Sequence, residues 1–284
     1  MAKVKAVVHG AVSLVNAIAN KKGATLGISL SVEATLETSP GKGIIIQSKN
    51  KTISSRLINK TVEKILTKKE LEQNKITLSL ESEIPTGYGL KSSSAISSAV
   101  ALACAKVFKP KLTDQQILLA GVDASIESKV SITGAYDDAC SCYFGGFNVT
   151  DNAKKKIVHA EKIPSNLIAI IFIPKNRKRG NVKNLKTLSA VFENAWTLAK
   201  NSNYWEAMII NGLATSTILN SDPKIITNLL EKGAIAASVS GNGPAIAAIV
   251  KKENEQNVKK VFSSLDGSII VSKVNNKKAE VYDL

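Results

Sequence analysis

Apolar and alternating runs, separated by turns that contain glycine or proline, open the chain and predict short strands. These runs cover residues 4–8, 28–38 and 43–47. Apolar residues at helical spacing then predict a helix over 56–71, and an alternating pattern predicts a strand over 76–80. Residues 92–108 are apolar or small on nearly all helix faces, which is typical of a buried helix. Thr113 is a candidate N-cap for the next helix, which runs toward Glu127.

The character of the sequence changes after Phe147. Residues 151–156 form a polar turn, and a second set of elements is predicted from residue 157 onward. The set comprises a buried strand over 167–174, helices over 185–201, 205–219 and 223–232, strands over 234–239 and 245–250, a helix near 254–265 and a strand over 268–274. This β-α-β-like series predicts a two-domain α+β protein, with an N-terminal domain over 1–160 and a C-terminal domain over 161–284.

Length and composition are those of an ordinary globular protein. Of the 284 residues, 44% are hydrophobic and 21% are charged, a balance that excludes a disordered chain. The apolar stretch 99–105 is far too short to span a bilayer, and no secretion signal opens the sequence. We therefore expect a cytoplasmic protein with no membrane partner. The three cysteines fit a reducing compartment, and structural roles for them are favoured over a zinc site because the chain has only two histidines.

The charge balance changes this picture. Lys and Arg number 38 against 23 Asp and Glu, which gives a net charge of +15 and favours anionic partners. A nucleic-acid-binding protein would be expected to gather its basic residues on one face, with interleaved aromatics for a single-stranded target. Here aromatics are 5% and the lysines are spread along the chain. A small anionic substrate is therefore favoured, and a basic nucleic-acid-binding protein stays as the alternative.

The strongest local signal is the run Pro85-Thr86-Gly87-Tyr88-Gly89-Leu90-Lys91-Ser92-Ser93-Ser94-Ala95. Two glycines allow the backbone to approach a ligand closely, and three serines then begin a buried helix whose free N–H groups favour an anion. A serine N-cap after a tight turn is the simpler explanation, but three serines exceed what a cap requires. The run matches neither a P-loop nor a protein-kinase signature. The candidate phosphate-binding residues are Pro85, Gly87, Gly89, Leu90, Lys91, Ser92, Ser93, Ser94 and Ala95.

Two later segments also carry candidate chemistry. Segment 133–147 contains the paired carboxylates Asp137 and Asp138, which could supply a base or hold Mg²⁺. A single Asp that caps the short helix to Phe144 is the alternative. The run Ser240-Gly241-Asn242-Gly243-Pro244-Ala245 follows a predicted strand, and its glycines indicate a close backbone approach. A strand-to-helix turn would explain this run as well.

These three segments, taken in order, resemble the GHMP kinase superfamily, which includes galactokinase, homoserine kinase and mevalonate kinase. In that family a P-x-G-x-G-L-G-S-S-A loop surrounds the ATP phosphates, and a late G-x-G-P loop lies beside the active site. Within the superfamily, the runs 9–18, 22–24, 89–95 and 133–139 are similar to the archaeal type of shikimate kinase. The chain departs from the broad family at Lys91, where most members have Gly.

The resemblance implies a fold and a set of roles. The expected fold is the α+β GHMP kinase fold, with an N-terminal domain like domain 2 of ribosomal protein S5 and a ferredoxin-like C-terminal domain. ATP and Mg²⁺ are the implied cofactors, Asp137 the implied catalytic aspartate, and Ser93 and Glu127 the implied metal ligands. Residues expected at the acceptor site are Asn16, Lys22, Arg177, Arg179, Gly241 and Gly243.

The two arginines of this set follow the strand that ends at Pro174, and a guanidinium suits a planar carboxylate. A solvated basic loop is the alternative interpretation. The implied function is ATP-dependent phosphorylation of the 3-hydroxyl of shikimate, for chorismate and aromatic amino-acid biosynthesis. Another small-molecule kinase, of the homoserine or mevalonate type, is the second hypothesis. We expect ATP and shikimate, rather than nucleic acid, as partners.

Overall fold

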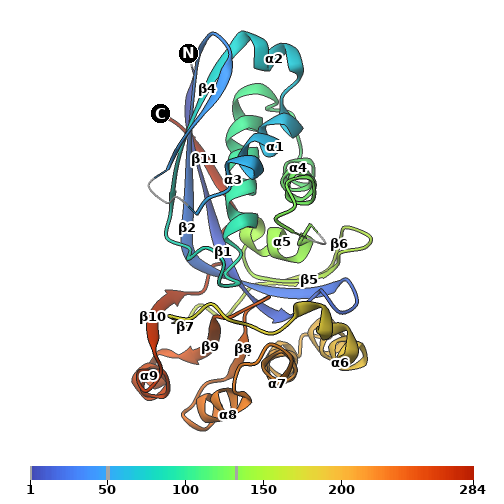
Figure 1. Ribbon diagram of the computed structural model, residues 1–284, viewed down its shortest axis with the longest axis vertical. Coiled ribbons are helices and arrows are strands. Elements are labelled where there is room, and N and C mark those ends of the chain that lie inside the picture. The colour runs from blue at the N-terminus through green and yellow to red at the C-terminus, as the bar shows by residue number, and fades with distance from the viewer. Residues whose placement is uncertain (1, 49–51, 132–133) are drawn as a thin grey trace.

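The computed structural model describes residues 2–48, 52–131 and 134–284, which form two β-sheets with helices packed against them (Figure 1). In the first sheet the strand order is β11-β1-β2-β4-β3, and β5 pairs with both β2 and β6. Its strands are β1 (Lys3–Val15), β2 (Lys22–Pro40), β3 (Gly43–Ser48), β4 (Asn74–Ser82), β5 (Phe147–Asp151), β6 (Lys156–Glu161) and β11 (Glu280–Asp283). Among its pairs in the described residues, β3 and β4 are parallel and the others are antiparallel.

The first half of the chain supplies the helices that cover one face of this sheet (Figure 1). They are α1 (Ser55–Ile65), α2 (Lys68–Gln73), α3 (Ser92–Phe108), α4 (Asp114–Glu127) and α5 (Tyr136–Phe144). Thirteen of the seventeen residues of α3 are buried, so the prediction of a central helix over 92–108 is confirmed. The helix predicted over 56–71 is wrong as one element, because Thr67 and Glu70 form a capping box that begins α2.

The second sheet has the order β10-β7-β9-β8 and is entirely antiparallel. Its strands are β7 (Leu167–Pro174), β8 (Ala236–Val239), β9 (Ile246–Lys251) and β10 (Gly267–Lys273). Numbered along the chain, this order is 4-1-3-2, the ferredoxin-like arrangement that the resemblance implied. The helices of this half are η1 (Val182–Leu188), α6 (Ser189–Lys200), α7 (Tyr204–Ile218), α8 (Pro223–Glu231), η2 (Lys252–Asn254) and α9 (Glu255–Ser263).

Two pairings, those of β6 and β11, depart from the sequence pattern. Strand β6 forms a hairpin with β5 in the first sheet, so the second set of elements begins at β7 rather than at residue 157. The turn at 240–245 joins two antiparallel strands, β8 and β9, which confirms the strands predicted over 234–239 and 245–250, so the alternative of a strand-to-helix turn is wrong. Strand β11 was not predicted; it returns the end of the chain to pair with β1 near the N-terminus (Figure 1).

Strand β2 is the element that brings the first sheet to the functional residues. Its first residues, 22–26, pair with β5, whereas residues 32–40 pair with β4. The start of β2 therefore lies beside α5, which begins with the paired carboxylates.

Cysteine placement and helix length give two further results. Cys104, Cys140 and Cys142 are free and buried, and burial raises the pKa of Cys104 to about 12. They act as small core residues, as expected. None of the helices in the described part of the chain is long and apolar enough to cross a membrane.

Candidate active site

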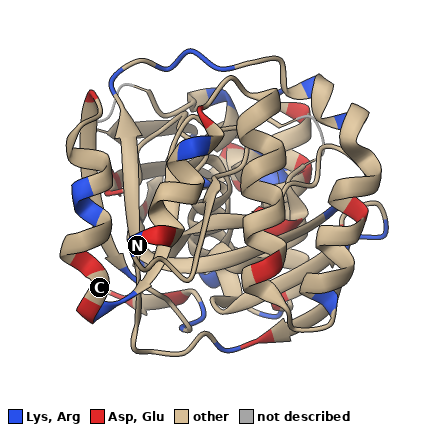
Figure 2. Ribbon diagram, turned by 90° about the horizontal axis from the view of Figure 1, so that it is seen from below, with Lys and Arg blue, Asp and Glu red and all other residues tan. Residues whose placement is uncertain are grey.

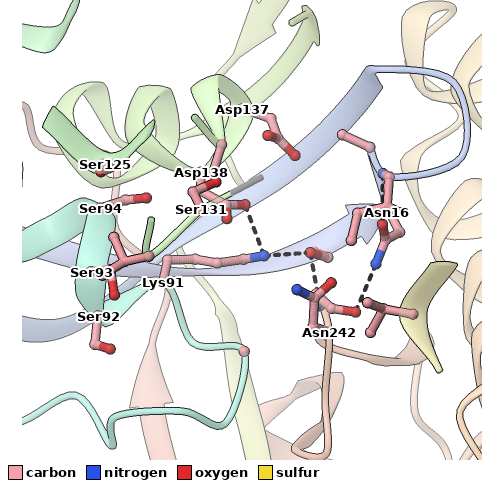
Figure 3. Close-up of a pocket in the computed structure, with 18 of the residues that line it drawn as sticks. Asn16, Lys91, Ser92, Ser93, Ser94, Ser125, Ser131, Asp137, Asp138 and Asn242 are labelled. Carbon is pink, nitrogen blue, oxygen red and sulfur yellow. Dashed lines mark hydrogen bonds and ion pairs between the residues drawn. The ribbon is translucent and has the colours of Figure 1, made fainter. Parts of the chain in front are cut away.

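A cavity of about 370 Å³ lies where six chain segments from both halves of the molecule meet. These are the end of β1, the loop that leads into α3, the end of α4 with the residues that follow it, the start of α5, the segment after β7 and the turn between β8 and β9. Figure 3 shows the residues that line it. They include Ser13, Asn16, Gly87, Gly89, Lys91, Ser92, Ser93, Ser94, Ser125, Ser131, Asp137, Asp138, Arg179, Gly241 and Asn242.

The loop before α3 turns because three of its residues have positive φ: Gly87 at 84°, Gly89 at 85° and Lys91 at 67°. A Cβ on Gly89 would lie 1.9 Å from the carbonyl oxygen of Ser240, so only glycine fits at this contact. The Ser240 hydroxyl also donates a hydrogen bond to the Gly89 carbonyl, at 2.8 Å. The β8–β9 turn therefore packs directly against the loop.

Helix α3 begins at Ser92, directly after this loop. Its free N–H groups and the side chains of Ser92, Ser93 and Ser94 are at the cavity. Ser93 is half-buried, whereas Ser92 and Ser94 are buried. No serine side chain caps the helix, because Lys91 occupies the N-cap position. The serine hydroxyls are therefore not used as N-caps, which favours the anion-binding interpretation of this run.

The Lys91 side chain extends across the cavity (Figure 3). Its ammonium lies 2.8 Å from Asp138 Oδ1 and donates to Ser13 Oγ at 2.7 Å. Ser13 Oγ also accepts from the Gly241 N–H at 3.0 Å. A Cβ on Gly241 would lie 2.7 Å from the Lys91 ammonium, so this glycine leaves room for the charge. One buried cation thus joins β1, the loop, α5 and the β8–β9 turn.

Asp137 is buried at the start of α5, with 4% of its surface exposed. Its Oδ1 accepts a hydrogen bond from Asn152 Nδ2 at 2.7 Å, and its carbonyl oxygen accepts from the Thr25 hydroxyl at 2.8 Å. Desolvation raises the pKa of Asp137 to about 7, with a further contribution from the neighbouring charge of Asp138. A carboxyl group of this kind exchanges a proton near neutral pH, as a general base must.

The β8–β9 turn contacts the first half of the chain through Asn16 and the segment after β7 through Arg179. Asn16 Nδ2 donates to the Gly241 carbonyl at 2.7 Å, and the Asn16 N–H donates to Asn211 Oδ1 at 2.8 Å. Arg179 donates to the carbonyls of Asn242 and Gly243, both at 3.1 Å. The turn is therefore fixed from two sides at the wall of the cavity.

Three residues expected at the site lie away from the cavity lining. Lys22 pairs with Glu193 and lies 4.7 Å from the ring centre of Trp196. Arg177 stacks on Tyr88 at 4.6 Å. Glu127 ends α4 and pairs with Lys64 of α1. Two residues along a helix turn by about 200°, so Glu127 points away from the cavity that Ser125 lines.

Some predicted residues contribute backbone rather than cavity surface. Pro85 and Leu90 belong to the loop before α3, Ala95 to α3 itself and Gly243 to the β8–β9 turn, and none of the four is among the lining residues. Thr133, part of the predicted carboxylate segment, lies outside the described residues.

The implied metal ligands do not come together. Ser93 lines the cavity and Glu127 does not. Within the described ranges, no group of three His, Cys, Asp or Glu side chains could hold a metal ion.

Sequence reasoning missed Ser13, Ser125, Ser131, Asn152 and Asn242. Asn242 lies between the two glycines of the turn at 240–245, and Asn152 lies in the polar turn after β5. Ser13 lies in the run 9–18 that carries the family resemblance, whereas Ser125 and Ser131 belong to no motif. That these serines line the cavity follows from strand pairing and helix phase.

Comparison with known proteins agrees with this geometry. The family described as GHMP kinases N terminal domain matches residues 56–146, and GHMP kinases C terminal matches residues 221–266. A shikimate kinase of Methanothrix thermoacetophila is 35% identical over 97% of this chain and 95% of its own length. The chain belongs to the GHMP kinase family. It is an ATP-dependent small-molecule kinase with the two-domain α+β fold of that family.

Other GHMP kinases extend the comparison. A shikimate kinase of Methanosarcina acetivorans is 36% identical over 95% of this chain and 93% of its own. The crystal structure of homoserine kinase from Cytophaga hutchinsonii matches with a TM-score of 0.78 at 20% identity, covering 99% of this chain and 98% of that one. The Methanococcus jannaschii mevalonate kinase matches with a TM-score of 0.77 at 16% identity, over 96% and 98%. The structural matches establish the GHMP fold and not the acceptor.

Proposed function

We propose that this GHMP kinase is a shikimate kinase, which transfers the γ-phosphate of ATP to the 3-hydroxyl of shikimate. The observation that carries the proposal is one cavity in which the start of α3 and the Asp137 carboxyl face the same space. The acceptor is supported by the names of relatives that are 35% and 36% identical over nearly the whole chain. The product, 3-phosphoshikimate, would enter chorismate and aromatic amino-acid biosynthesis in the cytoplasm.

The loop before α3 and the start of that helix are proposed to bind the ATP phosphates. Backbone N–H groups at a helix start attract anions, and the hydroxyls of Ser92, Ser93 and Ser94 add donors. Mg²⁺ arrives with ATP as part of the substrate, and Ser93 is proposed as its one contact from this chain. The chemistry that Mg²⁺ supplies is neutralisation of phosphate charge.

Lys91 is proposed to stabilise the phosphoryl group during transfer. Its ammonium lies between the phosphate loop and the carboxylates, and Asp138 and Ser13 fix it there. A fixed cation at the point where negative charge moves stabilises the transition state more than a mobile one. Asp138 is therefore assigned the role of positioning Lys91.

Asp137 is proposed to orient the acceptor hydroxyl and take its proton. The hydroxyl oxygen forms a bond to the γ-phosphorus, the bond from that phosphorus to the ADP oxygen breaks, and the proton moves to the Asp137 carboxylate. This base works only when ionised. Since its pKa is raised to about 7, turnover is expected to rise with pH through that value.

The distribution of charge favours this function over nucleic-acid binding. Figure 2 shows Lys and Arg on many elements with Asp and Glu interspersed, not gathered on one face. The net charge of +15 suits anionic small molecules, since both ATP and shikimate are anions. A nucleic-acid-binding protein would instead lose affinity steeply with salt and show no acceptor-dependent ADP release.

The decisive experiment is ADP release coupled to a dehydrogenase, with shikimate, homoserine or mevalonate as acceptor. We expect release with shikimate, and a ³¹P NMR spectrum of the product that shows a phosphate ester at the 3-position. Release with homoserine or mevalonate but not with shikimate would contradict the proposed acceptor and keep the kinase class.

The roles of the two carboxylates can be separated by substitution. Asp137→Asn is expected to lower kcat by about 10²–10⁴-fold, the usual contribution of a general base, with the KM for ATP kept. Asp138→Asn leaves the Lys91 charge without its partner, so we expect a smaller kcat loss and a higher KM for ATP. If Asp138→Asn proved the more damaging to kcat, the assignment of the base would be wrong by one residue.

A further inference from the structure

Asp137 has a neighbour that the function proposed above leaves unassigned. Asn152 follows β5 directly and has 7% of its surface exposed. Its backbone N–H donates to the Lys21 carbonyl at 2.8 Å, next to the start of β2. The β2–β5 pairing therefore fixes where this side chain begins.

The side-chain amide of Asn152 can be oriented in only one way. Its Oδ1 faces two donors, the Asp137 N–H at 3.2 Å and the Thr150 hydroxyl at 2.7 Å. An amide nitrogen at that point would face the backbone N–H of Asp137, which can only donate, with hydrogens of its own. Nδ2 must therefore face Asp137 Oδ1, which it meets at 2.7 Å.

Asn152 thus contacts Asp137 twice, at the backbone and at the carboxylate. The opposite side of the carboxylate is closed by Gly23 of β2, where an added Cβ would lie 2.3 Å from Oδ2. A carboxylate placed between an amide donor and a bare Cα cannot rotate freely. Its lone pairs are held in one direction relative to the cavity.

We propose that Asn152 is a positioning residue for the phosphoryl transfer: its amide holds the Asp137 carboxylate in place and in the ionised form that accepts the hydroxyl proton. This inference rests on the proposed function for the role of Asp137 as base. A neutral donor suits this task because it stabilises the carboxylate without supplying a positive charge that would make the base weak.

The other groups around Asp137 are few in the described part of the chain. Asp138 of the same helix raises its pKa, and Lys91 at the start of α3 lowers it. The titratable thiol of Cys140 lies one turn further along α5. Strands β2 and β5 present Gly23, Thr25 and Thr150 to Asp137 and its amide partner, and Lys22 of β2 is engaged with Glu193.

The test compares Asn152→Ala with Asn148→Ala. Asn148 is a matched control, because it is buried on the same side of α5 and donates to Ser141 Oγ and the Gly145 carbonyl but does not touch Asp137. Thr150→Val is the milder variant, since it removes only the hydroxyl that orients the Asn152 amide.

We expect Asn152→Ala to lower kcat by on the order of 10–100-fold while the KM for ATP stays within about twofold. The hydrogen bond favours the ionised carboxylate, so its loss raises the pKa of Asp137. The midpoint of the acid limb of the kcat profile should therefore move up by about one pH unit. Thr150→Val should move it in the same direction by less, and Asn148→Ala should leave it in place.

A second measurement does not depend on the acceptor. The Asp137 carboxyl can be titrated by ¹³C NMR in the wild-type protein and in each variant, with its signal assigned through Asp137→Asn. If wild-type protein phosphorylated no acceptor, the proposed function would fail, but this titration would still test Asn152. An unchanged Asp137 pKa in both Asn152→Ala and Thr150→Val would overturn the inference. So would an equal shift in Asn148→Ala.

Discussion

Lys91 combines a backbone conformation that lysine avoids with a side chain that is rarely buried. Its φ of 67° is in the left-handed region, at a cost of about 1–2 kcal/mol. Its ammonium is buried beside Asp138, and removal of one partner from such a pair typically costs about 3–5 kcal/mol. The two features are connected, since the left-handed conformation of Lys91 at the start of α3 directs its ammonium into the cavity. A glycine here would keep the turn and lose the charge.

Gly241 is the residue that makes space for this charge. Gly241→Ala would place a Cβ 2.7 Å from the Lys91 ammonium, which can move because it ends a flexible side chain. We expect the fold to persist with a stability loss of about 1–2 kcal/mol from the positive φ, and the KM for ATP to rise several-fold. Thermal unfolding and initial rates measure the two effects.

Gly43→Ala serves as the control for backbone strain. Gly43 also has positive φ, and no atom lies within 4 Å of its added Cβ. It should lose stability without any change in the KM for ATP. If Gly241→Ala also lost stability without a change in the KM for ATP, the space between Gly241 and the Lys91 ammonium would not matter for nucleotide binding.

Functional residues could be predicted from the sequence where residues that are adjacent in the chain also lie together in the cavity. The serine run and the pair Asp137 and Asp138 are of this kind, and both line the cavity. Asn152 and Gly23 could not be predicted, because they meet Asp137 only through the pairing of β2 with β5. No short-range pattern contains that pairing.

At the scale of elements, apolar periodicity located the helices but not all of their ends. The periodic pattern over 56–71 continues past Leu66, yet the Thr67–Glu70 capping box begins a new helix. The sequence signature for such a box, Thr three residues before Glu, was present and would have divided the element. For α4, Thr113 caps as predicted, and the phase of the helix then decides which side chains face the cavity.

Helix phase gives a prediction for Glu127. Its carboxylate pairs with Lys64 on the outside of α4, and 46% of its side-chain surface is exposed. Glu127→Gln should therefore change the stability by less than about 1 kcal/mol and leave the Mg²⁺ dependence of turnover unchanged. A Mg²⁺ titration of the rate at fixed ATP is the measurement.

Ser93→Ala is the comparison for this titration. Ser93 lines the cavity, so its substitution should weaken the use of Mg·ATP while the fold stays intact. A large rise in the Mg²⁺ requirement of Glu127→Gln would show that α4 turns or unwinds in the complex. In that case Glu127 would be a Mg²⁺ ligand, as the family resemblance implies, even though its side chain points away from the cavity here.

At the scale of the whole molecule, the two sheets carry different parts of the site. The first sheet and its helices hold the phosphate loop and the carboxylates, and the second sheet supplies the β8–β9 turn. The two-domain α+β fold was predicted from the alternation of elements, together with the motifs that carry the family resemblance. The pairing of β11 with β1 could not be predicted, because the four residues of β11 give no periodic signal of their own. Long-range pairing of so short a strand depends on the rest of the sheet.

The segment after β7 connects these two parts and gives the last prediction. It leaves the second sheet at Pro174 and reaches the first half of the chain, where Arg177 stacks on Tyr88 of the phosphate loop. Arg179, two residues on, lines the cavity and donates to the β8–β9 turn. The two arginines were expected to act together on the acceptor, but their contacts separate them. Arg177 contacts the loop proposed to bind the ATP phosphates, whereas of the two arginines only Arg179 lines the cavity.

Arg179→Lys should therefore raise the KM for shikimate by about tenfold with the KM for ATP kept, because a lysine cannot reproduce the planar fork that binds a carboxylate. Arg177→Lys should act instead on the KM for ATP, since it weakens the stacking on Tyr88. Lys178→Ala is the control, because it removes one charge from the same exposed segment without lining the cavity. Steady-state kinetics with each substrate varied in turn separates the cases.

An equal effect of Lys178→Ala on the KM for shikimate would mean that only the net charge of the segment matters. If both arginine variants were kinetically silent, the acceptor carboxylate would have to be bound elsewhere, with Asn16 as the first residue to test.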